Sequence, residues 1–448
     1  MTKNYEMDLT HGPLLKKIIL FSLPLMFTSM LQLLYNAADV VVVGAFAGDQ
    51  SLAAVGSTGS ITNLIVNLFM GMATGTGVIV AQSIGARDRE RLYKTVHTSM
   101  LVSVILGVFI SIFGVLSSHF VLTLMKSPPD VIDKATLYMR IYFLGTPALM
   151  VYNFGAAIIR SAGDTKRPLI ILGLSGIVNV VLNLIFVIIF HMDVAGVAIA
   201  TIISQYLSAI AIVLKLMHDD ADYKLFLSDL KIYKQELLGV LKYGVPMGLQ
   251  NSMFSLSNVI IQSSINSFGT FVVAGNAAES SINAFVLAAC DSGAQAAITF
   301  SGQNAGAKKF DRVKKSMVLC VLLTSVLGLV VGMIAFIFKV PLLSLYTDTP
   351  ESIAAGVEKM NILCPIYFTC GIMHTIGNTV RGMGKSVMPM ITTMFFVCIF
   401  RILWILTILP VYNTPSSIYI SYPISWVLAI VAHFIYFLFV FHRQKKLA

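Results

Sequence analysis

The chain has 448 residues, of which 57% are apolar and only 12% are charged, and its mean hydropathy is +0.84. Soluble domains carry about a quarter charged residues, so this composition excludes a water-soluble globular protein. Intrinsic disorder is excluded too, because disordered chains are poor in large apolar residues. We interpret the chain as a polytopic integral membrane protein.

Long apolar segments recur along the whole sequence. A helix needs about 20 apolar residues to cross a bilayer, and lipid favours helices because backbone groups must be satisfied internally. Windows of that length predict twelve membrane-spanning helices and therefore an all-α fold class. In chain order the predicted spans are residues 14–44, 52–81, 94–117, 134–158, 168–190, 194–216, 238–266, 272–301, 316–338, 354–378, 386–410 and 417–441.

Most of the 31 Lys and Arg residues fall in loops on one side of this predicted topology. Positively charged loops are typical of the cytoplasmic side of a membrane. Both termini and the long central loop are therefore predicted to be cytoplasmic, in a multi-pass protein of the cell membrane. The net charge of +10 is then a topology signal, and no nucleic-acid partner is expected.

Three short motifs occur twice, 221 or 222 residues apart. Pro24 recurs as Pro246, the Gln82-x-x-Gly-Ala motif recurs from Gln303, and Arg160-x-x-Gly recurs from Arg381. An even number of spans in each half gives the halves one orientation, with a pseudo-twofold axis along the membrane normal. The predicted organisation is an N-terminal lobe over residues 1–216, a cytoplasmic linker over 217–236 and a C-terminal lobe over 237–448. Two six-helix lobes of this kind are the architecture of a secondary transporter with its substrate site between them.

Asp39 is the clearest functional candidate, because a carboxylate inside an apolar span is costly. Gln32, Tyr35 and Asp39 share one face of the first span, and Asn63 and Asn67 lie on the second span. Asn179 and Asn183 on the fifth span and Thr201 on the sixth are predicted to surround the carboxylate. Such a group can exchange H⁺ for Na⁺; the alternative is an Asp that only hydrogen-bonds neighbouring helices.

The second half has no acidic residue equivalent to Asp39, because either offset falls on an isoleucine. Its polar candidates for the substrate cavity are Asn258, Gln262, Asn283 and Asp291, with interhelical hydrogen bonding as the alternative role. Pro24 and Pro246 are predicted to kink their helices and are candidate hinges.

Other charged residues in the spans are given structural roles. Arg401 is expected to pair with a buried carboxylate or a helix C-terminus, while Lys359 and Glu279 are expected to reach the membrane surface by extending their side chains. Asp291, and Glu279 if it does not extend in this way, are further candidates for ion coupling. The five cysteines predict neither a disulfide framework nor a metal site. Enzymatic activity, a cofactor and a metal are not expected, beyond a possible Na⁺ at Asp39.

The chain resembles the multidrug and toxic compound extrusion (MATE) family of transporters. The resemblance rests on Pro24 with Asn36-Ala-Ala-Asp39, the doubled Gln-x-x-Gly-Ala motif, Arg160-x-x-Gly163 with Pro168, and Arg401 with the segment 421–426. It implies export of cationic or amphipathic organic compounds by H⁺ or Na⁺ antiport, through rocking of two six-helix lobes. It also implies that Asp39 is the coupling residue, with Asn179 and Thr201 as polar partners, whereas Asn183 stands where some relatives have a second aspartate. Asn36, next to this site on the first span, is a further candidate for the substrate cavity.

Two other functions stay open from sequence alone. A flippase for a lipid-linked saccharide shares this architecture, although such proteins often have fourteen spans and a basic central cavity. A non-transporting membrane receptor or structural protein would need no coupling carboxylate. The physiological substrate and the coupling ion are not predicted; small organic cations, the lipid bilayer and a monomeric state are the expected partners and assembly.

Overall fold

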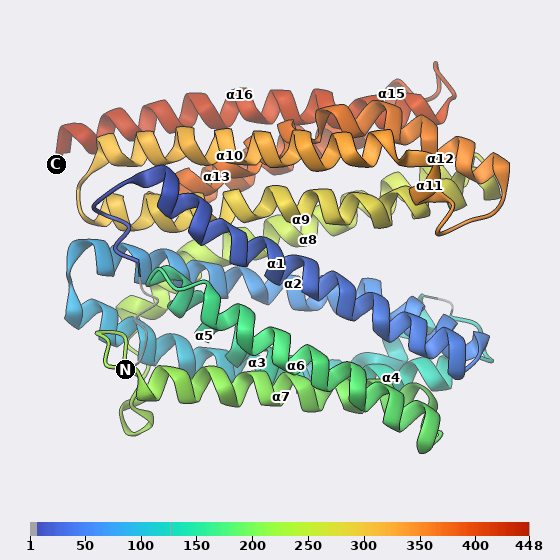
Figure 1. Ribbon diagram of the computed structural model, residues 1–448, viewed down its shortest axis with the longest axis horizontal. Coiled ribbons are helices and arrows are strands. Elements are labelled where there is room, and N and C mark those ends of the chain that lie inside the picture. Colours follow the sequence, from blue (N-terminus) through green and yellow to red (C-terminus); the bar gives the residue numbers. More distant parts are fainter. Residues whose placement is uncertain (1–6, 126, 448) are drawn as a thin grey trace. The chain divides into compact units, whose positions relative to one another are not determined.

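The computed structural model describes residues 7–125 and 127–447, apart from the side chains at positions 49, 57, 60 and 61. Every regular element in this part of the chain is helical, which confirms the all-α fold class (Figure 1). The helices of the N-terminal half are α1 (Leu14–Phe46), α2 (Asp49–Ala86), α3 (Arg89–Leu124), α4 (Ile132–Leu144), α5 (Thr146–Ser161), α6 (Lys166–Leu184), η1 (Ile185–Ile189) and α7 (Asp193–His218). A short helix, η2 (Leu227–Asp229), lies in the central loop.

The C-terminal half repeats this order of long helices. It contains α8 (Lys234–Asn266), α9 (Thr270–Gly306), α10 (Phe310–Ile337), α11 (Lys339–Leu343), α12 (Pro350–Leu363), η3 (Cys364–Ile366), α13 (Tyr367–Gly382), α14 (Val387–Thr393), η4 (Met394–Ile399), α15 (Phe400–Thr407) and α16 (Pro415–Leu447). Ten helical segments of the described chain are long and apolar enough to cross a membrane, and the pair α4–α5, bent by 44°, makes an eleventh. The remaining predicted span coincides with α8, which has 33 residues and carries a polar face. The predicted count of twelve is thus approximately matched.

Residues with positive φ recur at the same places in both halves. Gly48 and Gly269 precede α2 and α9 with φ of 81° and 95°, and Arg87 and Lys308 follow these helices with φ of 56° and 57°. The pairs are separated by the same interval as the sequence motifs. Because a non-glycine residue seldom adopts positive φ, the coincidence at Arg87 and Lys308 is strong evidence for a structural repeat.

The chain divides into two compact units, which are Met1–Met7 with Leu31–Gly248 and Asp8–Met30 with Leu249–Ala448. We call these the first and second unit. Both divisions fall inside continuous helices, α1 and α8, a few residues after Pro24 and Pro246. The first half of each helix therefore belongs to a different unit from its second half.

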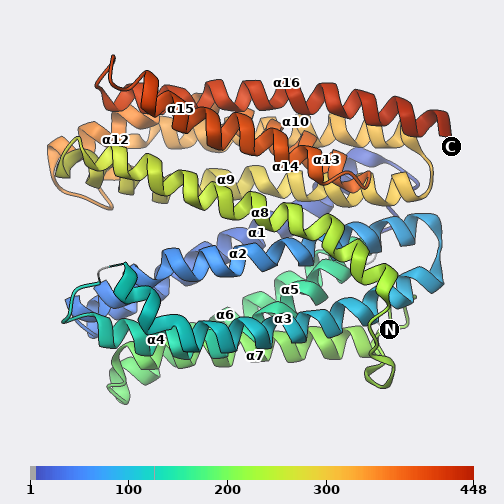
Figure 2. The ribbon, with the colours of Figure 1, turned by 180° about the vertical axis from the view of Figure 1, so that it is seen from behind.

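The first unit is built from α2–α7 around a continuous apolar core. Fully buried side chains such as Met139, Phe143, Phe154 and Ile212 belong to this core. Helices α6 and α7 lie side by side in both views of the ribbon (Figures 1 and 2). The α4–α5 bend falls at Gly145, followed by Thr146 and Pro147, because a proline in the first turn cannot continue the preceding helix.

Close helix crossing in the first unit depends on glycines. Gly71 and Gly75 of α2 face Gly244 and Gly248 of α8, and a Cβ atom on Gly75 would lie 2.6 Å from the Gly244 amide nitrogen. Small residues at four-residue spacing are typical of tightly crossed membrane helices. The sequence places a glycine wherever this crossing leaves no room for a side chain.

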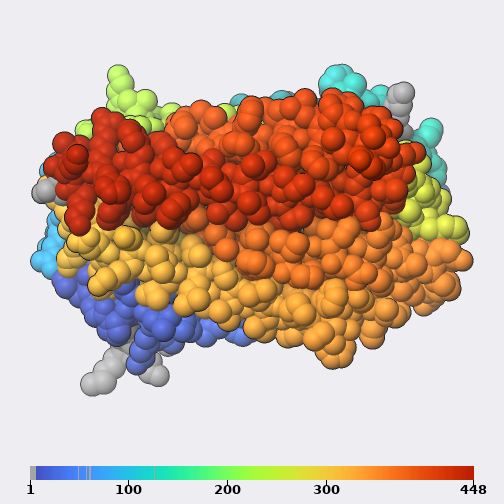
Figure 3. Space-filling model, turned by 90° about the horizontal axis from the view of Figure 1, so that it is seen from above, coloured from blue at the N-terminus to red at the C-terminus, as the bar shows by residue number. Residues whose placement is uncertain are grey.

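The second unit is built from α9–α16, with buried clusters around Met360, Tyr367 and Trp426 and around Val380 and Phe437. Helix α16 runs along one face of this unit (Figure 3). Its outward side chains, including Val431, Ile435 and Phe439, are more than half exposed. Apolar side chains exposed in this number fit a surface covered by lipid and not by water.

A short segment before α1 docks onto the second unit. Leu9 is fully buried, and its carbonyl oxygen accepts hydrogen bonds from Asn304 Nδ2 at 3.2 Å and Arg312 Nη2 at 3.3 Å. Partial burial alone would raise the pKa of Asp8, but hydrogen bonds from Thr10 and His11 outweigh it and lower the pKa to about 2. The Asp8 turn therefore stays ionised at physiological pH, and its contribution to stability is lost only as the pH falls from about 4 toward 2.

Candidate functional site

The predicted partners of Asp39 meet inside the first unit. Asp39 Oδ1 accepts a hydrogen bond of 2.5 Å from Asn183 Nδ2, and Asn183 Nδ2 also lies 3.3 Å from Asn179 Oδ1. Asn179 Nδ2 lies 3.4 Å from the Thr201 hydroxyl, which interacts with Asp39 as well. Helices α1, α6 and α7 thus each contribute to one polar network.

Local helix geometry explains this meeting. Asn179 and Asn183 lie one turn apart on α6, so both side chains point to the same side. Asn179 is 5% exposed and Asn183 is fully buried. Directly after Asn183 the helix changes to the π-turn η1, a local irregularity that is frequent near functional sites.

The Asp39 network consists of oxygen and amide groups without a counter-ion. In the described part of the chain, no Lys or Arg forms an ion pair with Asp39, and Asn183 Oδ1 has no hydrogen-bond partner. A carboxylate next to amide and hydroxyl oxygens can take up a proton or ligate a hard cation such as Na⁺. Among the described residues no cluster of His, Cys, Asp and Glu could hold a transition metal.

The other candidates on α1 and α2 are distributed more widely. Tyr35 donates a 3.0 Å hydrogen bond to the Gly173 carbonyl, and its ring occupies the space above Gly176. Gln32 and Asn36 are exposed on α1. On α2, Asn63 is exposed and Asn67 is half-buried. In the described part of the chain, neither side chain forms a hydrogen bond with Asp39.

Two tyrosines near Asp39, the buried Tyr138 and the partly buried Tyr142, could not be assigned to the site from the sequence. Tyr138 and Tyr142 of α4 lie within the electrostatic range of the Asp39 carboxylate. Their four-residue spacing on an apolar helix is the signal that could have suggested them.

The second unit contains a cavity of about 400 Å³. The predicted residues Asn258, Gln262 and Asn283 all line it, whereas Asp291 does not and instead accepts a 3.4 Å hydrogen bond from Gln295. The further lining residues are Phe254, Ile261, Ile265, Asn276, Ser280, Leu287, Lys359, Leu363, Cys370, Met373, His374, Arg401, Tyr422 and Trp426.

Lys359 and Glu279 form a buried ion pair, and so the expectation that both extend to the membrane surface is wrong. Lys359 also donates to Asn276 Oδ1 at 2.7 Å and to Ser280 Oγ at 3.1 Å. Tyr367 donates a 2.5 Å hydrogen bond to Glu279. The ion pair and these hydrogen bonds compensate two charges whose burial would otherwise cost too much free energy. Both side chains can therefore remain buried in the second unit.

Arg401 also departs from its expected pairing. Its Nε donates a 2.9 Å hydrogen bond to Ser425, and its guanidinium lies 3.9 Å from the centre of the Tyr422 ring. No carboxylate is among its partners in the described residues. The aromatic ring supplies a weaker compensation for the charge than an ion pair would.

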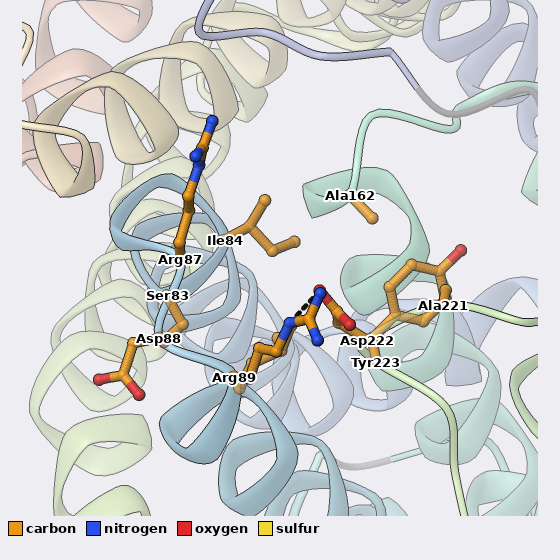
Figure 4. Close-up of a pocket in the computed structure, with 10 residues that line it drawn as sticks. Ser83, Ile84, Arg87, Asp88, Arg89, Ala162, Ala221, Asp222 and Tyr223 are labelled. Carbon is orange, nitrogen blue, oxygen red and sulfur yellow. Dashed lines mark ion pairs between the residues drawn. The ribbon is translucent and has the colours of Figure 1, made fainter.

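A second cavity, of about 350 Å³, lies between the end of α2, the start of α3 and the central loop of the first unit. Figure 4 shows Arg89 and Asp222 paired there, at 3.1 Å, with Arg87 pointing away from them. These charged side chains are exposed. The cavity has the character of a solvated loop junction and is not our candidate site.

The fold and these two polar regions define a polytopic helical membrane transporter built from two repeats. The MatE family model matches residues 24–185 and again residues 246–407. The chain belongs to the MatE family, as the resemblance of its motifs implied. The two matched segments begin and end 222 residues apart, in agreement with the repeat.

Similar proteins cover almost the whole chain. "Probable multidrug resistance protein YoeA" of Bacillus subtilis is 25% identical over 96% of this chain and 95% of its own length. "Probable multidrug resistance protein YpnP" of the same species is 25% identical over 88% of each chain. A solved structure of a multidrug resistance MATE family transporter in an outward-facing conformation has a TM-score of 0.92 at 23% identity and covers 100% of this chain and 99% of its own. The comparison with this solved structure shows that the two proteins have the same fold.

Proposed function

We propose that this protein is a secondary active exporter of cationic or amphipathic organic compounds, driven by antiport of H⁺ or Na⁺. One observation carries the proposal: among the described residues, the hydrogen-bond partners of the Asp39 carboxylate are the neutral groups of Asn183 and Thr201, inside the first unit. If a fixed cation were permanently paired with a membrane carboxylate, the charge would already be neutralised and no exchangeable ion would be required. Asp39 can interact with such an ion, because its neighbours in the described part of the chain supply oxygen ligands and no fixed positive charge.

The names of the relatives support the same class of activity. The Bacillus subtilis relatives are named as probable multidrug resistance proteins, and another, from Thermotoga maritima, carries the same description. We extend that description to this chain, with Gln32, Tyr35, Asn36, Asn63, Asn67, Asn258, Gln262, Asn283 and Asp291 as candidates for substrate contact. On this proposal the protein acts as a monomer in the cell membrane, with both termini in the cytoplasm and no cofactor.

Alternating access is proposed to use α1 and α8. The boundaries between compact units fall inside these two helices, near Pro24 and Pro246. A proline removes one backbone hydrogen bond from a helix and so lowers the cost of bending there. We therefore keep both prolines as hinge candidates and the sequence halves 1–216 and 237–448, joined by 217–236, as the proposed lobes.

Transport in proteoliposomes tests this proposal and identifies the ion. Vesicles loaded with ethidium, a cationic aromatic dye, would receive either a pH gradient or a Na⁺ gradient alone. We expect one of the two gradients to accelerate ethidium movement several-fold over vesicles without protein. Ion-coupled export would be rejected if ethidium moved at the same rate with the pH gradient, with the Na⁺ gradient, without a gradient and in vesicles without protein.

A further inference from the structure

The cavity of the second unit is positively charged. Lys359, His374 and Arg401 line it, whereas no Asp or Glu is among its described lining residues. Lys359 is neutralised by Glu279, which lies behind it and is only 1% exposed. Asp291 lies outside the lining but within electrostatic range of His374 and Cys370. Arg401 is therefore the cation of the lining that has no ion-pair partner among the described residues.

Arg401 has unused hydrogen-bonding capacity. The side chain is 4% exposed, and its Nη2 atom has no hydrogen-bond partner among the described residues. Tyr422 and Trp426 cover the guanidinium, with ring centres at 3.9 and 5.7 Å. A buried cation with an unsatisfied donor is costly, so an acceptor that enters the cavity would gain more here than at the surface.

The repeat relates this charge to the Asp39 network. Pro168 and Pro389 are 221 residues apart, but the matched repeats end 222 apart, at 185 and 407. The π-helical segment η4, which lies between Pro389 and Arg401, accounts for the extra residue, since a π-turn holds one residue more than an α-turn. With this insertion, Arg401 occupies the position of Asn179, and the place of Asp39 falls on Ile260 or Ile261.

We propose that the cavity of the second unit binds the acidic group of an aromatic organic anion, with Arg401 as its counter-ion. The planar guanidinium presents parallel donors that match a carboxylate or sulfonate. Tyr422, Trp426 and Phe254 supply aromatic surface for a ring attached to that group. A volume of about 400 Å³ lies within the range of small-molecule sites, roughly 300–1,000 Å³.

This site extends the substrate class of the proposed exporter to aromatic acids and zwitterions. Only the identification of the bound molecule as cargo rests on the proposed function; the binding itself does not. The two repeats would then carry opposite charges at non-equivalent positions: Arg401 stands at the position of the neutral Asn179, and an isoleucine stands at the position of Asp39.

Calorimetric titration of the purified full-length protein with two matched probes tests the proposal. The probes are 2-naphthoate and 2-naphthylmethylammonium, which share a ring system and differ in charge. We expect the naphthoate to bind at least tenfold more tightly than the ammonium compound. Arg401→Gln should weaken naphthoate binding at least tenfold. Arg401→Lys keeps the charge but loses the parallel donors of the guanidinium, so its affinity for naphthoate should lie between those of Arg401→Gln and the wild type.

The matched control is Arg443→Gln, which removes an exposed arginine near the end of α16 and should leave binding unchanged. Absence of naphthoate binding to the wild type, or equal binding by a folded Arg401→Gln, would overturn the proposal. If Arg401→Gln does not fold, Arg401→Lys decides, because wild-type affinity in that variant would contradict bidentate recognition. Naphthoate binding without gradient-driven ethidium transport would reject the proposed function alone, and the reverse result would reject only this site.

Discussion

Three charged side chains inside the described helices are accommodated in three different ways. Asp39 has neutral hydrogen-bond donors, Glu279 has the ammonium group of Lys359, and Arg401 has aromatic rings. The differences matter because a permanent ion pair fixes a charge, whereas neutral donors leave it free to bind another ion. The Glu279–Lys359 pair is therefore suited to a structural role in the second unit, and Asp39 is suited to the ion exchange that we propose for it.

Breaking the Glu279–Lys359 pair is expected to destabilise the second unit strongly. Lys359→Met leaves the Glu279 carboxylate buried without its cation, at a cost of about 3–5 kcal/mol. The double variant Glu279→Gln/Lys359→Met should recover most of that loss, because no uncompensated charge remains. Thermal unfolding in detergent measures both, and a double variant as unstable as the single one would contradict the pairing.

The residues that meet at Asp39 could be grouped from the sequence because they follow helical spacing. Asn179 and Asn183 lie one turn apart, and each was recognisable as a polar residue in an apolar span. The partnership of Glu279 with Lys359 was not predictable in this way, since it depends on how α9 and α12 pack. Two isolated opposite charges in separate spans were the available signal, but spacing along the chain does not show that they meet.

At the scale of the helices, the boundaries followed from hydropathy and their irregularities did not. The twelve predicted spans correspond approximately to helices or to runs of shorter helices, but the 44° bend between α4 and α5 and the π-turns η1 and η4 were not predicted. These features depend on side-chain packing within one turn. The docking of Leu9 was likewise invisible, because an isolated leucine outside the apolar spans gives no periodic signal.

The glycine crossing of α2 with α8 gives a prediction at this scale. Gly244→Ala places a Cβ atom against the backbone of Met72, and the required shift of α8 should cost on the order of 1–3 kcal/mol. Gly44→Ala is the matched control, because its Cβ would meet only Leu52 side-chain atoms, at 3.5 Å or more. The melting temperatures of the two variants in detergent test the difference, and equal values would show that the crossing tolerates a methyl group.

For the whole molecule, the repeat was detectable from three doubled motifs and is matched by the recurrence of positive φ at Gly48, Gly269, Arg87 and Lys308. The assignment of helix halves to compact units was not detectable from the sequence. Nothing in the apolar pattern of α1 or α8 distinguishes the residues before Met30 or Gly248 from those after them. Hydropathy reports contact with lipid, whereas membership of a unit depends on contacts between helices.

We propose that transport by the whole molecule depends on the exchange of one ion at Asp39. Its most direct test is substrate-dependent ion flux through Asp39→Asn in proteoliposomes, with Asp222→Asn of the exposed central loop as the matched control. We expect ethidium to release H⁺ or Na⁺ across membranes that contain the wild type or Asp222→Asn, and the flux to fall at least tenfold in folded Asp39→Asn, because an amide cannot carry the exchangeable charge. Wild-type ion flux in Asp39→Asn would contradict the account.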